Sequence, residues 1–219
     1  MIPRQIFKIW VGDNPQPKDF DKYIDSWQNA QCLIVPINNS DIEMCYFETR
    51  SDFFKWAVDS KKWALVNHYL RYWLLFKNGG IYMDLDVQVI KTFPVFANCL
   101  HIGMESERWL NNCFMASNPG HTFFSDCMSF METIDRNTKE IELETGPRLV
   151  TNIIQKYTDW KPRKMDFKEL YEYKDNFVSI YPERYFSPHR WYENFTTSEI
   201  TPDTITVHHY CHSWKPSEN

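Results

Sequence analysis

The 219-residue sequence lacks several features that would assign it to a common class of protein. It has no basic run, and its net charge of −5 and pI near 5.8 argue against nucleic-acid binding. Its apolar runs are too short to cross a bilayer, so no integral membrane segment is predicted. Charges interrupt the first eight residues, so no signal peptide is expected. We therefore expect a soluble, cytoplasmic protein.

The cysteines also lack a pattern that would indicate a metal site or a disulfide framework. No two are close in sequence, and none shows Cys-x-x-Cys spacing. We expect free, mostly buried thiols in a reducing compartment. The length fits one domain, residues 1–219. The six cysteines are Cys32, Cys45, Cys99, Cys113, Cys127 and Cys211.

Strand-like and helical segments alternate in the first part of the chain. Residues 6–11 are apolar except for Lys8 and lead into Gly12, as a strand followed by a loop would. A second strand is expected at 32–36, and helices at 18–30 and 50–60. This order predicts an α/β fold with a parallel or mixed sheet flanked by helices. Ligands of such sheets bind at the carboxyl ends of the strands.

The stretch from 62 to 94 predicts a helix that ends at a glycine pair and leads into a strand with two aspartates. Side chains two residues apart in a strand point the same way, so Asp84 and Asp86 are expected to share one face where the strand ends. Two such carboxylates suit Mn²⁺ or Mg²⁺, which keeps open positions for the oxygens of a nucleotide diphosphate. The simpler interpretation is a pair of solvated turn aspartates.

This stretch resembles the sugar-binding DXD-motif glycosyltransferases of family 32, which include yeast mannosyltransferases, capsular polysaccharide enzymes and enzymes of large algal viruses. The family core reads Ala-x-x-Ser-Asp-x-x-Arg, then Gly-Gly-x-Tyr-x-Asp-x-Asp. The chain departs from it at the Ser-Asp pair, where it has Asn67 and His68. The matching positions are Ala64, Arg71, Gly79, Gly80, Tyr82, Asp84 and Asp86.

The resemblance implies a GT-A-type nucleotide-binding sheet and an enzyme that uses Mn²⁺ or Mg²⁺. Such an enzyme transfers a sugar from a UDP-sugar donor to a glycan or glycoprotein acceptor, with retention by a front-face reaction or a double displacement. The predicted catalytic residues are Asp84, Asp86 and Arg71, with Asp86 and Asp84 on the metal. The predicted nucleotide-sugar contacts are Trp10, Gly12, Asn67, His68, Arg71, Gly80, Tyr82, Asp84, Ser213 and Trp214.

The family also ends in a His-His-aromatic-x-x-Ser-Trp pattern, which the chain matches from His208 to Trp214. Imidazole binds Mn²⁺ well, and strand alternation sends His208 and His209 to opposite faces. At most one of them can therefore join the aspartates. His208 is the predicted third metal ligand, because it aligns with the first histidine of the family.

The remaining segments carry weaker signals. Strands are expected at 99–104 and 112–117, and a solvated loop at 135–144. Proline-bounded edge strands are expected at 178–182 and 185–188.

Two other functions stay open at this point. A non-catalytic carbohydrate-binding module would explain the many aromatic residues and an acidic metal site. A phosphatase of the Asp-x-Asp type is a weaker alternative, because Gln88 stands where such enzymes have Thr or Val.

Overall fold

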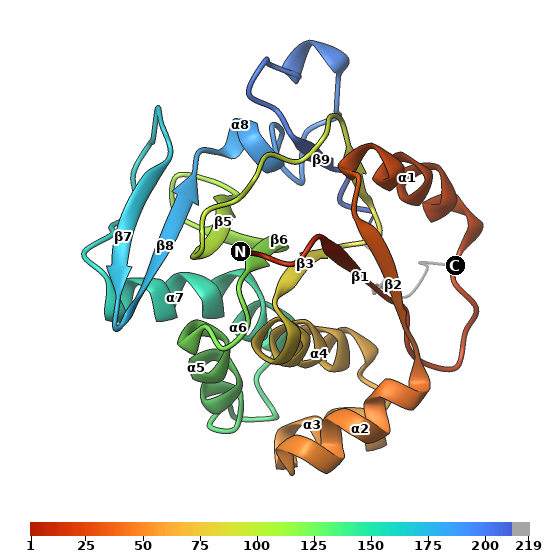
Figure 1. Ribbon diagram of the computed structural model, residues 1–219. Coiled ribbons are helices and arrows are strands. Elements are labelled where there is room, and N and C mark those ends of the chain that lie inside the picture. The colour runs from red at the N-terminus through yellow and green to blue at the C-terminus, as the bar shows by residue number, and fades with distance from the viewer. Residues whose placement is uncertain (212–219) are drawn as a thin grey trace.

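The computed structural model describes residues 1–211. A mixed seven-stranded sheet runs through its centre with helices on both faces (Figure 1), which confirms the predicted α/β fold. The strand order is β2-β1-β3-β6-β5-β8-β7, and a separate two-stranded sheet pairs β4 with β9. The strands are β1 (Gln5–Ile9), β2 (Leu33–Ile37), β3 (Gly80–Met83), β4 (Val87–Val89), β5 (Leu100–Met104), β6 (Leu110–Ser117), β7 (Glu169–Tyr173), β8 (Asn176–Tyr181) and β9 (Thr206–His208).

Each face of the large sheet has its own apolar core. Helices α2 to α7 cover one face, in the lower half of Figure 1, where Leu70 and Leu149 are buried. Helices α1 and α8 lie over the other face, where Trp27 and Phe186 are buried. The α-helices are α1 (Asp21–Asp25), α2 (Asn39–Thr49), α3 (Asp52–Asp59), α4 (Trp63–Asn78), α5 (Thr122–Met131), α6 (Ile141–Thr145), α7 (Pro147–Tyr157) and α8 (Glu183–Phe186), and the 3₁₀ helices are η1 (Lys18–Phe20), η2 (Ser26–Ala30) and η3 (Thr197–Glu199).

The directions of the central strands place their loops together. β1 lies between β2 and β3 and is parallel to both. The chain therefore leaves β1 after Ile9 and β3 after Met83 at the same edge of the sheet. The predicted site residues that follow these strands start from neighbouring positions.

Four local predictions outside the aspartate turn were wrong. The single helix expected at 18–30 is divided into η1, the five-residue α1 and η2. The loop expected at 135–144 contains the start of α6. The segment expected as an edge strand at 178–182 belongs to β8, which lies inside the sheet between β5 and β7. The segment 185–188 ends α8 instead of forming a strand. The edge position is taken by β7, whose charged side chains hide the strand signal because an edge strand leaves one of its flanks open to solvent.

Two general expectations can be compared directly with the structure. All six cysteines are free, and four of them are buried, as predicted. Among the helices formed within residues 1–211, none combines the length and the apolar character needed to span a bilayer.

Candidate metal and donor site

Asp84 and Asp86 lie in a tight turn between two sheets. β3 ends at Met83, β4 begins at Val87, and the Val87 N–H donates to the Asp84 carbonyl at 3.0 Å across the turn. The expectation of one continuous strand through both aspartates was therefore wrong. The turn forms because β4 leaves the large sheet and pairs with β9.

His208 reaches the aspartates on β9, which is antiparallel to β4. Its Nε2 lies 3.3 Å from Asp86 Oδ1 and 3.8 Å from Asp84 Oδ2. One ligand atom from each of the three residues can be chosen so that all lie within 4.8 Å of one another. The carboxylates and the imidazole therefore converge on one point, as the donor set of a divalent cation would.

His209 turns away from this cluster. Its Nε2 lies 3.0 Å from the side-chain oxygen of Gln88, and its ring stacks on Tyr23 at 4.4 Å between centroids. Of the two neighbouring histidines, the structure thus brings His208 to the carboxylates, as the alternation of the strand predicted.

The chain after β9 wraps around Asp86, which is only 9% exposed. His209 N–H donates to the Asp86 carbonyl at 3.0 Å, and Cys211 N–H donates to Asp86 Oδ2 at 2.7 Å. Burial alone would raise the pKa of Asp86, but His208 and the Cys211 N–H outweigh it and lower the pKa to about 2. Asp86 is therefore an ionised carboxylate with a fixed orientation.

Arg71 on α4 is buried behind Asp84 at 4% exposure. Its Nη2 lies 3.2 Å from Asp84 Oδ1 and donates to Asn67 Oδ1 at 2.9 Å. Its Nη1 donates to the Asn112 carbonyl at 2.8 Å. Its guanidinium carbon lies 4.2 Å from the centre of the Tyr82 ring. Arg71 thus joins α4, β3 and β6 at the aspartate turn.

Tyr82 and Arg71 engage the same oxygen of Asp84. The Tyr82 hydroxyl bonds Asp84 Oδ1 and lies 3.0 Å from Asn67 Oδ1. The other carboxylate oxygen, Oδ2, is the one that lies nearest to His208. The structure therefore brings together three predicted donor contacts, Asn67, Arg71 and Tyr82, around Asp84. Their contacts with one another and with Asp84 orient that carboxylate.

His68 lies one residue away from this network on α4 and is half-buried. Its Nδ1 lies 2.8 Å from Thr145 Oγ1, at the end of α6. Burial, and to a smaller extent Arg71, hold the pKa of His68 well below its ordinary value. The imidazole is therefore neutral near pH 7, and its position faces the loop between α6 and α7.

The predicted contacts after β1 lie in a different environment. The half-buried Trp10 donates its indole N–H to the Asn14 carbonyl at 2.8 Å. Gly12 has φ +119° and donates its N–H to Asn39 Oδ1 at 2.9 Å. A methyl group on Gly12 would lie 2.9 Å from the Trp63 ring. Gly12 therefore allows the β1 loop to approach both α2 and α4 closely.

Gly80 has a packing role in the structure. A methyl group there would lie 2.8 Å from Gln5 Cγ, so Gly80 lets β3 lie against β1. The two remaining predicted contacts, Ser213 and Trp214, lie outside the described residues 1–211.

Sequence reasoning missed two polar residues at the ends of strands beside this site. Glu105 directly follows β5; burial raises its pKa, while His208 lowers it and Asp84 raises it. Asn112 lies on β6, where its carbonyl accepts from Arg71. No motif distinguishes either residue. The carboxyl end of β5 could have indicated Glu105, whereas Asn112 lies near the amino end of β6 and reaches this edge of the sheet because β6 is antiparallel to β3.

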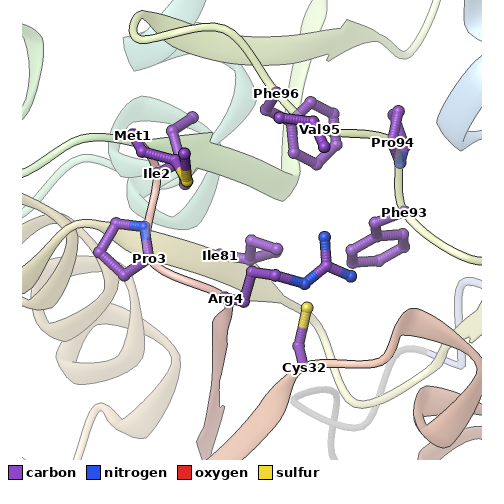
Figure 2. A pocket seen from close by; sticks show the side chains of 10 residues that line it. All are labelled: Met1, Ile2, Pro3, Arg4, Cys32, Ile81, Phe93, Pro94, Val95 and Phe96. Atoms are coloured by element: carbon purple, nitrogen blue, oxygen red, sulfur yellow. The ribbon is translucent and has the colours of Figure 1, made fainter.

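A small apolar hollow of about 50 Å³ lies apart from the acidic cluster. Figure 2 shows its lining, which comes from the first four residues, Cys32, Ile81 and the loop from Phe93 to Phe96. It contains no carboxylate or histidine. The chemistry of Asp84, Asp86 and His208, and not this hollow, therefore indicates the functional site.

Comparisons with known proteins agree with this geometry. Residues 8–109 match the family described as "Glycosyltransferase sugar-binding region containing DXD motif". Over nearly its whole length the chain is 24% identical to an uncharacterized glycosyltransferase of Acanthamoeba polyphaga mimivirus, and it covers 85% of that protein. The solved structure of "PaToxG Glycosyltransferase" shares the fold with a TM-score of 0.59 and 20% identity, over 71% of this chain and 69% of that one.

Two animal enzymes match a smaller part of the chain. Lactosylceramide 4-alpha-galactosyltransferase of Pan troglodytes is 28% identical over 64% of this chain, which covers 38% of that enzyme. Human alpha-1,4-N-acetylglucosaminyltransferase is 26% identical over 64% of this chain, which covers 39% of that enzyme. The chain thus spans less than two-fifths of these two relatives. The resemblance to the DXD-motif glycosyltransferases is confirmed.

Proposed function

We propose that this member of the DXD-containing glycosyltransferases moves a sugar from a UDP-sugar to a hydroxyl group of a glycan or glycoprotein acceptor, with retention at the anomeric carbon. The observation that carries this proposal is the convergence of Asp84, Asp86 and His208 within 4.8 Å at the carboxyl end of β3. Both the family match and the fold favour an enzyme over a non-catalytic carbohydrate-binding module or a phosphatase.

The donor set fits Mn²⁺, with Mg²⁺ as the alternative. Two carboxylates and one imidazole are a mixed oxygen and nitrogen set, and a nitrogen ligand suits Mn²⁺ better than it suits Mg²⁺. Asp86, Asp84 and His208 would hold the ion, with the donor diphosphate at its open positions. When bound, the ion stabilises the negative charge that develops on the departing UDP.

The protein groups around the ion orient it and the donor. Asp86 cannot rotate freely, because Cys211 N–H occupies its Oδ2 and His208 faces its Oδ1. Asp84 is held through Oδ1 by Arg71 and Tyr82. Partners behind a ligand fix its orientation in this way and raise the affinity of metal sites.

The reaction exchanges one bond at the anomeric carbon. The bond from C1 to the β-phosphate oxygen of UDP breaks, and a bond from C1 to the acceptor oxygen forms. In a front-face reaction the departing phosphate oxygen takes the proton of the acceptor hydroxyl, so no carboxylate nucleophile is required. A double displacement would need such a nucleophile. Glu105 is one candidate, because the charges of His208 and Asp84 both shift its pKa.

Calorimetry with UDP in the presence and absence of Mn²⁺ tests the proposed function. We expect binding that depends on Mn²⁺, and at least about tenfold weaker binding by Asp86→Asn. Asp59→Asn, which removes an exposed carboxylate paired with Lys55, is the matched control. Equal UDP affinity in Mn²⁺ for Asp86→Asn and the wild type would reject the assignment. Proton NMR of the first product formed would separate retention from inversion.

A further inference from the structure

The outermost strand of the large sheet, β7, has an open flank and an uncovered face. β7 pairs with β8 on one side, and no strand within residues 1–211 pairs with its other side (Figure 1). Tyr171 and Tyr173 pack against the core that helices α2 to α7 cover. Leu170 points to the opposite face and is 61% exposed, and Phe177 on the same face of β8 is 46% exposed. An open edge strand with exposed apolar side chains is a template for pairing with another chain.

The backbone groups of β7 that point outward come from alternate residues. A two-residue turn, 174–175, joins the paired residues Tyr173 and Asn176. In such a turn the Tyr173 carbonyl accepts from the Asn176 N–H, so Tyr173 directs its backbone groups toward β8. Since these groups alternate in direction along a strand, the N–H and C=O of Leu170 and Glu172 point away from β8.

The opposite edge of the sheet, β2, is protected in a way that β7 is not. The Leu33 N–H donates inward to the Arg4 carbonyl at 2.9 Å, so Ile34 and Pro36 direct their backbone nitrogens outward. Pro36 has no N–H to offer to a further strand. β7 contains no proline, so its outward backbone groups can all pair.

Charged side chains flank Leu170 in a complementary order. Lys168 stands two positions before Leu170 and Glu172 two positions after it, so the three side chains share one face of the strand. The Lys168 ammonium lies 5.6 Å from the centre of the Tyr181 ring, on that same face. Within residues 1–211, neither Lys168 nor Glu172 belongs to an ion pair. Both charges are therefore available to a second molecule.

We propose that two copies of this chain pair antiparallel through β7, with the two-fold axis at Leu170. Leu170 then exchanges backbone hydrogen bonds with Leu170 of the second copy, and Lys168 lies opposite Glu172 of the second copy. The sheet continues from one copy into the other. Charges on an edge strand usually oppose such pairing, but here each meets its opposite. This proposal concerns the assembly of the protein and does not rest on the proposed function.

The order of the charges distinguishes this register from its neighbours. An axis at Glu169 or at Glu172 would bring two glutamates together. An axis at Tyr171 would place Glu172 opposite Leu170 and leave its charge without a partner. An axis between two residues would place outward backbone groups opposite inward ones. The axis at Leu170 therefore satisfies both the backbone and the charges.

A second copy fits this surface better than an anionic membrane does. Residues 159–177 carry equal numbers of basic and acidic side chains, so they do not form the basic patch that anionic lipids attract. Self-pairing requires such a balance, because the same strand supplies both partners.

Sedimentation velocity of the full chain at increasing concentration measures the dimer. Stable complexes bury about 1,200–2,000 Å² and one pair of strands buries less, so we expect a reversible dimer over about 10–200 µM. Leu170→Lys and Leu170→Glu each place two like charges at the axis and should weaken the dimer at least about tenfold. Leu33→Lys is the matched control, because it puts a charge on a leucine that is 67% exposed at the β2 edge. It should change the dissociation constant by less than about twofold.

Charge exchange at low ionic strength tests the register. Lys168→Glu and Glu172→Lys each set like charges opposite one another and should weaken self-association at least about threefold. An equal mixture of the two variants is expected to form heterodimers, because every charge then meets its opposite in the other variant. The double variant, with both exchanges in one chain, should regain the dimer of the wild type.

Several outcomes would overturn the proposal. A wild type that stays monomeric at about 200 µM excludes the dimer. A dimer that survives both Leu170 variants, or one that Leu33→Lys weakens as much, does not form through β7. A mixture without heterodimers rejects the placement of Lys168 opposite Glu172. Monomers that bind vesicles of phosphatidylcholine and phosphatidylserine through Leu170 would assign this face to a lipid surface instead. Thermal unfolding within about 3 °C of the wild type shows that each variant is folded.

Discussion

Arg71 and Asp84 form an ion pair beneath the surface of the site, with Nη2 3.2 Å from Oδ1 and Arg71 only 4% exposed. The same guanidinium serves Asn67 and the Asn112 carbonyl. A buried pair of this kind contributes little net stability compared with an apolar replacement, but removing one partner leaves a buried charge unpaired. The contacts of Arg71 instead hold α4, β6 and the turn after β3 in one fixed arrangement.

Arg71→Lys is expected to destabilise the fold by at least about 2 kcal/mol, because an ammonium cannot reproduce two directed contacts on the planar guanidinium. Arg163→Lys is the control. Arg163 pairs with Glu169 at 46% exposure, so its change should stay within about 0.5 kcal/mol. Urea unfolding of both variants measures the difference, and equal losses would contradict a structural role for the Arg71 contacts.

His208→Ala and His209→Ala make a matched pair of neighbouring substitutions. His208→Ala is expected to weaken Mn²⁺ binding about 10- to 100-fold, because it removes the imidazole that faces both aspartates. His209→Ala should have a much smaller effect, since His209 contacts Gln88 and Tyr23. The rise in Tm with added Mn²⁺ reports this affinity. A larger loss for His209→Ala would reverse the assignment of the third ligand.

Gly12→Ala is expected to destabilise the protein more than Gly120→Ala. Both glycines have positive φ, +119° and +75°, so each substitution strains the backbone by about 1–2 kcal/mol. A methyl group on Gly12 would also lie 2.9 Å from the Trp63 ring, whereas nothing lies within 4 Å of one on Gly120. The clash should add about 1–3 kcal/mol at Gly12. Chemical unfolding measures the loss of stability in both variants. Equal losses for Gly12→Ala and Gly120→Ala would show that the Trp63 ring moves aside and that the clash adds nothing.

Stability is expected to fall as the pH drops from 6.5 to 4, in part because of His101. This residue is 1% exposed, and burial lowers its pKa from 6.5 to about 4. Between these values the unfolded chain binds the proton and the folded chain does not, so up to about 3 kcal/mol present above pH 6.5 is lost on acidification. His101→Gln should flatten the curve of unfolding free energy against pH. An unchanged slope would contradict this contribution.

The sequence predicted the helix, the glycine pair and the aspartates because these signals are local. The periodicity of α4 and its end at Gly79 depend on neighbouring residues, and the structure confirms both. Long-range pairing was not predictable in the same way. The break between β3 and β4 follows from the partner of β4, which is β9, far along the chain.

The site residues divide along the same line. The motif was enough to identify Asp84 and Asp86 as site residues. Strand alternation correctly predicted that His208 and His209 point in opposite directions, with His208 toward the aspartates. Asn112 carries no motif, and its place beside Arg71 depends on the order of β3 and β6 in the sheet. The contact between Thr145 and His68 likewise required the packing of α6 on α4, which no local pattern indicates.

The contact between Cys211 and Asp86 spans 125 residues of sequence. During translation at about 5–20 residues per second, the ribosome adds the second half of this contact about 6–25 seconds after the first. For that interval Asp86 is present in the nascent chain without His208 or the Cys211 N–H. The cluster of Asp84, Asp86 and His208 therefore cannot exist on a growing chain until β9 has been synthesised and has paired with β4, so any affinity for a cation that depends on all three residues is expected to arise only late in synthesis.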